Sequence, residues 1–118
     1  MPPSTAELTK RLLAFRDERD WRQFHSLKNL MLSVSLEAAE LLELAQWKDE
    51  DALEAAVSTP EFRQRLGEEC ADVLLHLLLV CERAGIDLAA AADAKIDLNR
   101  RRYPADKARG NATKHDRL

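Results

Sequence analysis

A long segment with apolar side chains on every side is the feature that most constrains the fold of this chain. Every residue in 73–81 except His76 is apolar. Upstream, Thr59-Pro60 supplies an N-cap followed by proline at the first helical position, and Gly85 downstream is a natural helix stop. A helix that is apolar all round has to be surrounded by other elements. We therefore expect a helix over residues 60–85 inside an all-α fold, with a partner subunit covering one of its faces.

Three further helices are predicted from capping residues and apolar spacing. Ser4 and Glu7 have the spacing of a capping box, and Asp87 is a suitable N-cap for the last helix. The predicted helices cover residues 4–19 with a face of Leu8, Leu12 and Phe15, the stretch from Leu27 through Leu44, and residues 87–102, ended by Tyr103-Pro104. We predict a loop with a short helix or turn for residues 48–58. No segment has the pattern of a strand.

The length and composition are those of one folded helical domain, residues 1–118, in which residues 105–118 form a flexible basic C-terminal tail. Hydrophobic residues make up 46% of the chain and charged residues 33%, and the net charge is −3. Residues 100–118 carry seven Lys/Arg against two Asp, a balance of +5, which leaves −8 for the rest. An acidic body with only six aromatic residues argues against a nucleic acid polymer as partner.

No part of the sequence has the pattern of a membrane span or a signal peptide. No apolar run reaches the ~18 residues that a spanning helix needs. The N-terminus lacks basic residues followed by an apolar core. We therefore expect a cytoplasmic protein that does not bind membranes.

Two pairs of acidic residues lie within the apolar helical segments. Glu37 and Glu40 are three residues apart, as are Glu69 and Asp72, and residues at this spacing are neighbours on a helix. If the two helices pack face to face, four carboxylates share a half-buried cleft, where they repel one another and need a cation. Mg²⁺ prefers oxygen ligands and leaves positions for water and substrate phosphates. The acids therefore predict a Mg²⁺-dependent enzyme acting on a phosphate compound.

The acidic pairs are also compatible with two other classes of protein. Each pair alone suits a solvated helix surface, so the chain could be a non-catalytic helical oligomeric binding module that uses its apolar surface. That module would bind no Mg²⁺, and Glu37→Ala would leave its function intact. A di-iron carboxylate bundle would instead need Glu-x-x-His pairs, and none of the three histidines stands three residues after a glutamate.

Five blocks, in order along the chain, resemble a known family. They are DWRQFHSLKNL (20–30), EAAE (37–40), Gln46-Trp47, EECAD (68–72) and KIDLNRRRYP (95–104). The chain is similar in these blocks to the all-α nucleoside triphosphate pyrophosphohydrolases of the MazG-like group, and within that group to the dCTP pyrophosphatases. The resemblance covers nearly the whole chain. It implies a four-helix-bundle-like subunit that is completed by oligomerisation, as a homotetramer built from paired dimers.

The resemblance also implies an activity and a metal site. The activity is hydrolysis of a nucleoside triphosphate, dCTP or a modified dCTP, between the α and β phosphates to give the monophosphate and pyrophosphate. The implied ligands of Mg²⁺, with Mn²⁺ as a substitute, are Glu37, Glu40, Glu69 and Asp72. We expect Glu40, ahead of Glu37, to be the catalytic carboxylate that orients or deprotonates the attacking water. A broader or dUTP-directed pyrophosphohydrolase is the alternative within this class.

The resemblance assigns substrate binding to seven residues: Trp21, His25, Trp47, His76, Lys95, Asn99 and Tyr103. The tryptophans and His25 match positions that enclose the base, where aromatic faces can sandwich a pyrimidine. Lys95 and Asn99 match triphosphate contacts. His76 and Leu12 depart from the cytidine-selective relatives, which have Tyr or, in some, His at these places, so the base preference stays open. The alternatives are a satisfied core histidine at position 76 and core tryptophans.

Overall fold

The computed structural model describes residues 1–118 and is helical throughout, without strands, so the predicted all-α class is confirmed. Its elements are α1 (Thr5–Glu18), a 3₁₀ turn (Arg22–Phe24), α2 (Leu27–Glu43), α3 (Glu50–Ala56), α4 (Pro60–Ala84), α5 (Leu88–Arg102), α6 (Ala105–Ala108) and a second 3₁₀ turn (His115–Arg117). The chain divides into two compact units, residues 1–85 and residues 86–118, which we call unit 1 and unit 2.

The helices begin and end at the residues that the capping patterns indicate, although the hydroxyl of Thr59 donates to the carbonyl of Ala56 and does not cap α4. The hydroxyl of Ser4 accepts a hydrogen bond from the backbone N–H of Glu7 at 3.2 Å, and the carboxylate of Glu7 accepts one from the backbone N–H of Ser4 at 3.4 Å. Asp49 and Asp87 cap α3 and α5 in the same way through their carboxylates. Gly85 ends α4 with a φ of +72°, in the left-handed region that favours glycine.

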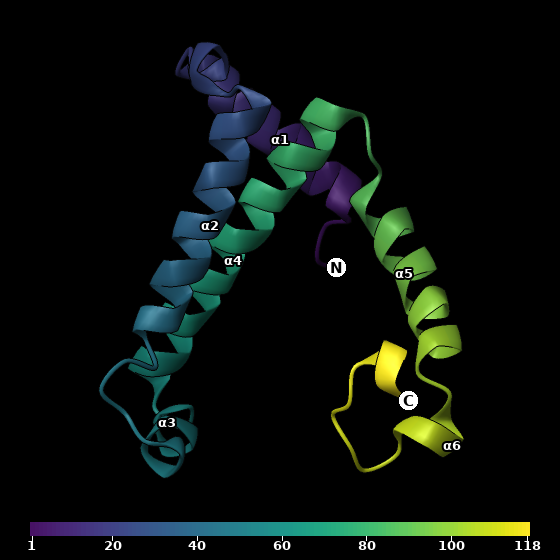
Figure 1. Ribbon diagram of the computed structural model, residues 1–118. Helices are drawn as coiled ribbons and strands as arrows, with labels where there is room; N and C mark the ends of the chain where they lie inside the picture. Colours follow the sequence, from purple (N-terminus) through teal and green to yellow (C-terminus); the bar gives the residue numbers. More distant parts are fainter. The chain divides into compact units, whose positions relative to one another are not determined.

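The core of unit 1 lies between α2 and α4, which run side by side, and α1 packs against α4 (Figure 1). Its buried apolar side chains come from both helices: Leu30 and Leu44 from α2, and Phe62, Leu78 and Leu79 from α4. Burying a leucine or phenylalanine side chain contributes about 1.5–3 kcal/mol. The α2–α4 seam is therefore the element that positions any site between these helices.

The buried face of α1 differs from the predicted one. Leu8 and Leu12 are half-buried as expected, but Phe15 is 44% exposed. The buried position in the last turn is taken by Arg16, which is 9% exposed. Arg16 continues the i, i+4 spacing of the two leucines, so the stripe that faces the interior passes through it rather than through Phe15.

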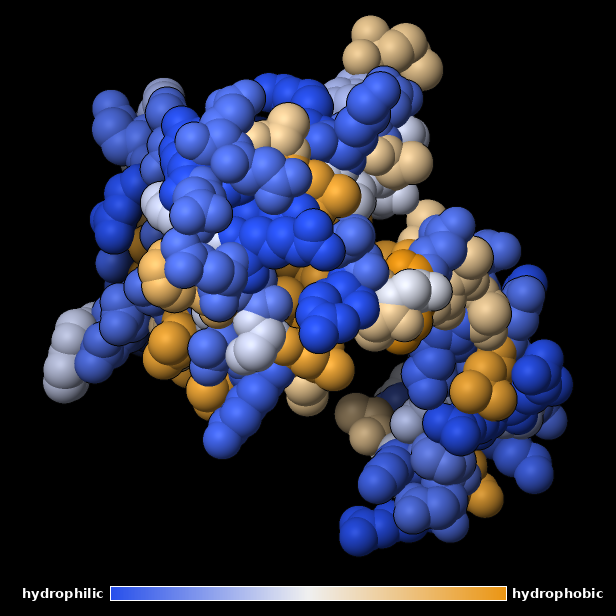
Figure 2. Space-filling model, turned by 90° about the horizontal axis from the view of Figure 1, so that it is seen from above, coloured by the Kyte–Doolittle hydropathy of each residue, from blue (hydrophilic) through white to orange (hydrophobic).

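Unit 1 leaves much apolar surface open to solvent. In α4, Leu74 is 37% exposed, so the helix that is apolar all round is not fully covered within the chain. Large apolar side chains on α2 are also exposed, with exposed fractions from 39% to 71%: Leu27, Met31, Leu32, Leu36 and Leu42. Figure 2 shows hydrophobic side chains at the surface among the hydrophilic ones. Cover by a partner subunit stays a prediction.

Unit 2 consists of α5, α6 and the end of the chain. After α6 the chain turns at Gly110 and returns, so that the rings of Tyr103 and His115 meet edge to face with centroids 5.7 Å apart. The Asn111 side chain donates to the carbonyl of Lys107 at 2.9 Å and accepts from the backbone N–H of Thr113 at 3.0 Å. The predicted tail thus contains a short helix and a 3₁₀ turn. No helix of either unit is long and apolar enough to cross a membrane.

Candidate metal centre

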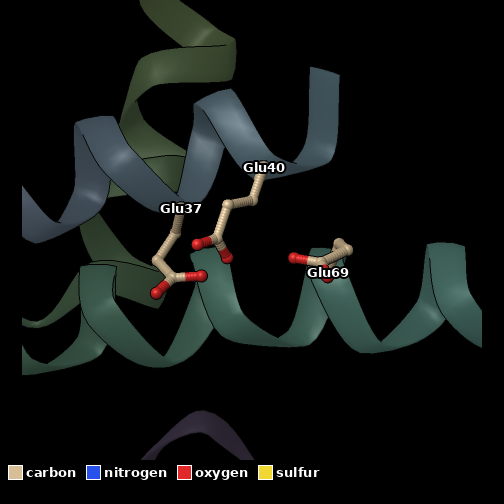
Figure 3. A group of neighbouring side chains, drawn as sticks. All are labelled: Glu37, Glu40 and Glu69. Atoms are coloured by element: carbon tan, nitrogen blue, oxygen red, sulfur yellow. The ribbon is translucent and has the colours of Figure 1, made fainter. Parts of the chain in front are cut away.

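Three of the four predicted metal ligands meet on the α2–α4 seam. Glu37 and Glu40 lie one turn apart on α2, and both project toward α4, from which Glu69 projects toward them (Figure 3). One carboxylate oxygen from each residue lies within 4.8 Å of the others. The i, i+3 spacing within one helix and the packing of two apolar helices together produce this cluster. We call Glu37, Glu40 and Glu69 the acid cluster.

The acid cluster holds charge in an unfavourable place. Glu37 and Glu69 are half-buried, and each has a carboxylate oxygen that is buried without a hydrogen-bond partner. Burial raises the pKa of Glu37 above its usual value, and the adjoining carboxyl of Glu40 raises it further. Burial also raises the pKa of Glu69, with Glu40 and Asp72 adding to the effect. Buried oxygens without partners, among like charges, are suited to a hard cation such as Mg²⁺.

Asp72, the fourth predicted ligand, lies beside the acid cluster rather than within its tightest group. It is half-buried on α4, one turn beyond Glu69. Its negative charge is close enough to raise the pKa values of both Glu37 and Glu69. The structure therefore brings all four predicted acids to one region of the seam, with three in direct proximity.

His76 lies one further turn along α4, near the acid cluster. Its Nδ1 is 2.7 Å from the backbone carbonyl of Asp72. A carbonyl only accepts, so Nδ1 carries the proton in this arrangement and Nε2 remains available to another partner. The imidazole is half-buried and lies close enough to Glu37 to lower its pKa, against the larger opposing effects. One nitrogen is thus satisfied, as the core alternative requires, and the other is free to act in the site.

His25 and Trp21 lie on the segment between α1 and α2. Burial lowers the pKa of His25, and the nearby Arg16 and His76 lower it further, which favours the neutral form of the imidazole. Its Nδ1 is buried without a partner. Trp21 is 44% exposed and packs edge to face on Phe15, with ring centroids 5.7 Å apart. His25 is therefore placed near His76, and Trp21 is only partly covered.

Trp47 is the most exposed large hydrophobic residue apart from Met1, at 94%. Its φ of +67° is in the left-handed region, which costs a residue with a Cβ about 1–2 kcal/mol. The alternative that Trp47 is a core residue is therefore wrong within this chain. A large aromatic side chain held in a strained conformation and in solvent is typical of a contact with a ligand or a partner.

Three of the predicted substrate-binding residues lie in unit 2. Lys95 is exposed and Asn99 half-buried on α5, and Tyr103 is the C-cap residue of that helix. The backbone N–H of Tyr103 donates to the carbonyl of Asn99 at 2.8 Å. Their spacing along one helix is as predicted, and their role toward a substrate stays a prediction.

Sequence reasoning missed Arg16, whose guanidinium is nine-tenths buried at a cavity between the ends of α1, α2 and α4. The available signal was its place at i+4 after Leu12 on an otherwise apolar stripe. An arginine in such a position is either covered by a partner group or lines a polar cavity.

Comparison with known proteins gives three consistent similarities. Residues 32–118 match the model of the MazG-like family. The proteins named dCTP pyrophosphatase 1 from Homo sapiens and Mus musculus are 43% and 42% identical to this chain over 118 residues, which cover 99% of this chain and 69% of each relative. A crystal structure of a pyrophosphatase from Archaeoglobus fulgidus DSM 4304 is 38% identical, with a TM-score of 0.78, and the match covers 88% of this chain and 95% of that one.

Proposed function

This chain belongs to the MazG-like family, and we propose that it is a nucleoside triphosphate pyrophosphohydrolase that acts on dCTP or a modified dCTP. The reaction is hydrolysis of the bond between the α and β phosphates, giving the nucleoside monophosphate and pyrophosphate. The names of the human and mouse relatives support the choice of substrate. The relatives align with nearly the whole chain, so the similarity includes both units.

The observation that carries the proposal is the acid cluster. Carboxylates from two helices converge within 4.8 Å, and two of their buried oxygens have no partner in the chain. Such a group is costly unless it holds a cation. Glu37, Glu40, Glu69 and Asp72 would hold Mg²⁺, with Mn²⁺ as a substitute. A divalent cation supplies charge neutralisation on phosphate oxygens and lowers the pKa of a coordinated water.

Within this group, Glu40 is our candidate for the residue that orients or deprotonates the attacking water. Glu37 is half-buried and has a raised pKa, and Glu69 is also half-buried, whereas Glu40 is exposed at the open side of the cluster. Substrate and water approach from solvent, so the exposed carboxylate meets them first. Glu37 and Glu69, which are more enclosed, are better suited to holding the cation in place.

The remaining predicted residues would bind other parts of the nucleotide. The Nε2 of His76 and the imidazole of His25 are polar groups that can bind the substrate beyond the acids. The exposed indole rings of Trp21 and Trp47 can stack on a pyrimidine. Lys95 and Asn99 would contact the triphosphate, with Tyr103 as their neighbour in the sequence.

We further propose that the chain assembles into a homotetramer of paired dimers. The exposed apolar residues of α2 and the exposed Trp47 support this, because contiguous apolar surface marks interaction sites. Neighbouring subunits would cover α2 and the open side of α4. Residues of one subunit would then reach the site of another.

The test is a panel of nucleoside triphosphates with Mg²⁺, in which pyrophosphate and orthophosphate are measured separately. We expect pyrophosphate and the monophosphate, with dCTP or a modified dCTP as the best substrate. Orthophosphate alone would exclude cleavage at the α–β bond. Equal rates on purine and pyrimidine substrates would replace the dCTP assignment by the broader one, and preference for dUTP by the dUTP-directed one.

A further inference from the structure

A cavity lined by three arginines lies at the end of unit 1, outside the acid cluster. It has a volume of about 510 Å³ and lies between the C-terminal ends of α1 and α4 and the N-terminal end of α2. Its charged lining residues are Arg16, Arg22, Arg83 and Glu82, and the imidazole of His25 also lines it. We call it the arginine cavity. Seen from above, this end of unit 1 is mostly hydrophilic (Figure 2).

Arg16 is the fixed group of the arginine cavity. Its side chain is 10% exposed, and its Nε donates to the carboxylate of Asp17 at 2.8 Å. One terminal nitrogen, Nη1, is 3.8 Å from a carboxylate oxygen of Glu82, which is too long for a hydrogen bond. A guanidinium has five N–H donors, so the terminal nitrogens of a nearly buried arginine are left to face the cavity without a close partner.

The charges around the arginine cavity favour an anion. Three guanidinium groups face one carboxylate in the lining, although residues 1–99 as a whole carry a charge of −8. Ser26, the N-cap residue of the 17-residue helix α2, also lines the cavity, and a helix N-terminus is the positive end of its dipole. Guanidinium groups bind phosphate oxygens through paired, charge-assisted hydrogen bonds.

We propose that the arginine cavity is a metal-independent binding site for a phosphoryl oxyanion, either inorganic phosphate or the phosphate group of a larger molecule. Arg16 forms its floor, and Arg22 and Arg83 form its exposed rim. Leu30 in its lining is seven residues before Glu37, so the two sites are separated by about 10 Å along α2. Glu82 competes with the anion for Arg16.

The test is isothermal titration calorimetry of the full chain with inorganic phosphate, in EDTA and at constant ionic strength. We expect saturable binding with one site per chain. Arg83→Gln and Arg22→Gln should each weaken it by about tenfold, because each removes a charge-assisted hydrogen bond. Arg63→Gln is the matched control: this exposed arginine is on α4, about 30 Å along the helix from Arg83, and should change the affinity by less than about twofold.

Glu82→Gln should change the phosphate affinity in the opposite direction. This variant therefore distinguishes a phosphate site from a site that binds a nucleobase. Removing the competing carboxylate should tighten phosphate binding, whereas a site that needs an acceptor for an amino group would bind its ligand more weakly. No saturable binding, equal effects of Arg83→Gln and Arg63→Gln, or weaker binding in Glu82→Gln would each overturn the proposal. Because these titrations contain no divalent cation, they do not depend on hydrolysis, and Glu40→Gln should leave them unchanged.

A second arm identifies the source of the anion. The titration is repeated with Mg²⁺ and a non-hydrolysable analogue of dCTP. Loss of phosphate binding would assign the cavity to a phosphate group of the nucleotide, and unchanged binding would assign it to free phosphate.

Discussion

Glu37 and Glu40 lie one helical turn apart and yet have different surroundings. The first is half-buried with an unpartnered oxygen, and the second is exposed. We expect Glu40→Gln to lower kcat by at least about a hundredfold, as removal of a general base commonly does, with little change in the free energy of unfolding. The measurement is pyrophosphate release together with denaturant unfolding.

Glu43→Gln is the matched control, because this exposed glutamate is the next acid along α2 and lies outside the acid cluster. It should retain activity. A Glu40→Gln variant that keeps normal turnover would show that the catalytic carboxylate belongs to another residue.

The raised pKa values of Glu37 and Glu69 predict how stability depends on pH. In metal-free protein the folded chain holds these protons above the ordinary glutamate pKa of 4.5, where the unfolded chain has released them. The free energy of unfolding therefore falls as the pH rises from that value through the raised pKa values. Mg²⁺ binds the ionised carboxylates, so the stability that it adds should increase over the same range.

The measurement is thermal unfolding at a series of pH values, with EDTA and with Mg²⁺. Glu69→Gln should flatten the decline in EDTA and reduce the stabilisation by Mg²⁺, and Glu43→Gln should change neither. If the unsubstituted protein and the Glu69→Gln variant showed the same dependence of stability on pH in EDTA, the electrostatic account of the acid cluster would be contradicted.

Which single residues could be predicted depended on how local their surroundings are. The spacing of Glu37, Glu40 and Glu69 within apolar segments sufficed to place them on one seam. The burial of Arg16 was signalled only by its place at i+4 after Leu12, and a charged residue at the end of such a stripe is usually exposed. The left-handed backbone at Trp47 likewise has no signal in the side chain itself.

At the scale of the elements, the two glycines associated with α4 have opposite roles. Gly85 has a φ of +72°, and a Cβ added there would meet no atom within 4 Å, so only backbone strain opposes a substitution. We expect Gly85→Ala to destabilise unit 1 by about 1 kcal/mol. Gly67 is within the helix and is also unobstructed, so Gly67→Ala should stabilise by about 0.5–1 kcal/mol.

Denaturant unfolding of the Gly85→Ala and Gly67→Ala variants measures the two changes in the free energy of unfolding. Because the side chain added is the same, the difference in sign isolates the backbone conformation. Destabilisation by both variants would mean that an added methyl group is not tolerated on α4, and the left-handed stop would not be the cause.

The helices themselves were largely predictable because their end signals are local. Ser4, Asp87 and Gly85 have the predicted roles, and α3 occupies part of the stretch predicted as a loop with a short helix. The 3₁₀ turn at Arg22–Phe24 and helix α6 were not predicted, since elements of three or four residues have too few positions to show a period.

At the scale of the whole molecule, the exposed face of α2 should be the surface that joins subunits. Leu42 is 71% exposed and Leu36 is 65% exposed. We expect Leu42→Arg to shift the protein from the proposed tetramer to smaller species, because a buried arginine without a partner is strongly unfavourable in an interface. Size-exclusion chromatography with light scattering measures the mass.

Gln64→Arg introduces the same charge at an exposed polar position of α4 and should leave the mass unchanged. A Leu42→Arg protein that remains a tetramer would place the interface elsewhere. The sequence could predict that apolar surface must be covered, but the identity of the face depends on how α2 turns about its own axis when it packs on α4.

The placement of the two tryptophans has an experimental consequence. Trp21 is 44% exposed and Trp47 is 94% exposed in the single chain, and the sequence contains no third indole. Their fluorescence therefore comes mainly from solvent-facing rings, and whatever covers Trp47, whether a base or a neighbouring subunit, changes its emission. The molecule thus contains an intrinsic spectroscopic reporter in the turn that follows α2, which can follow assembly and nucleotide binding without any label.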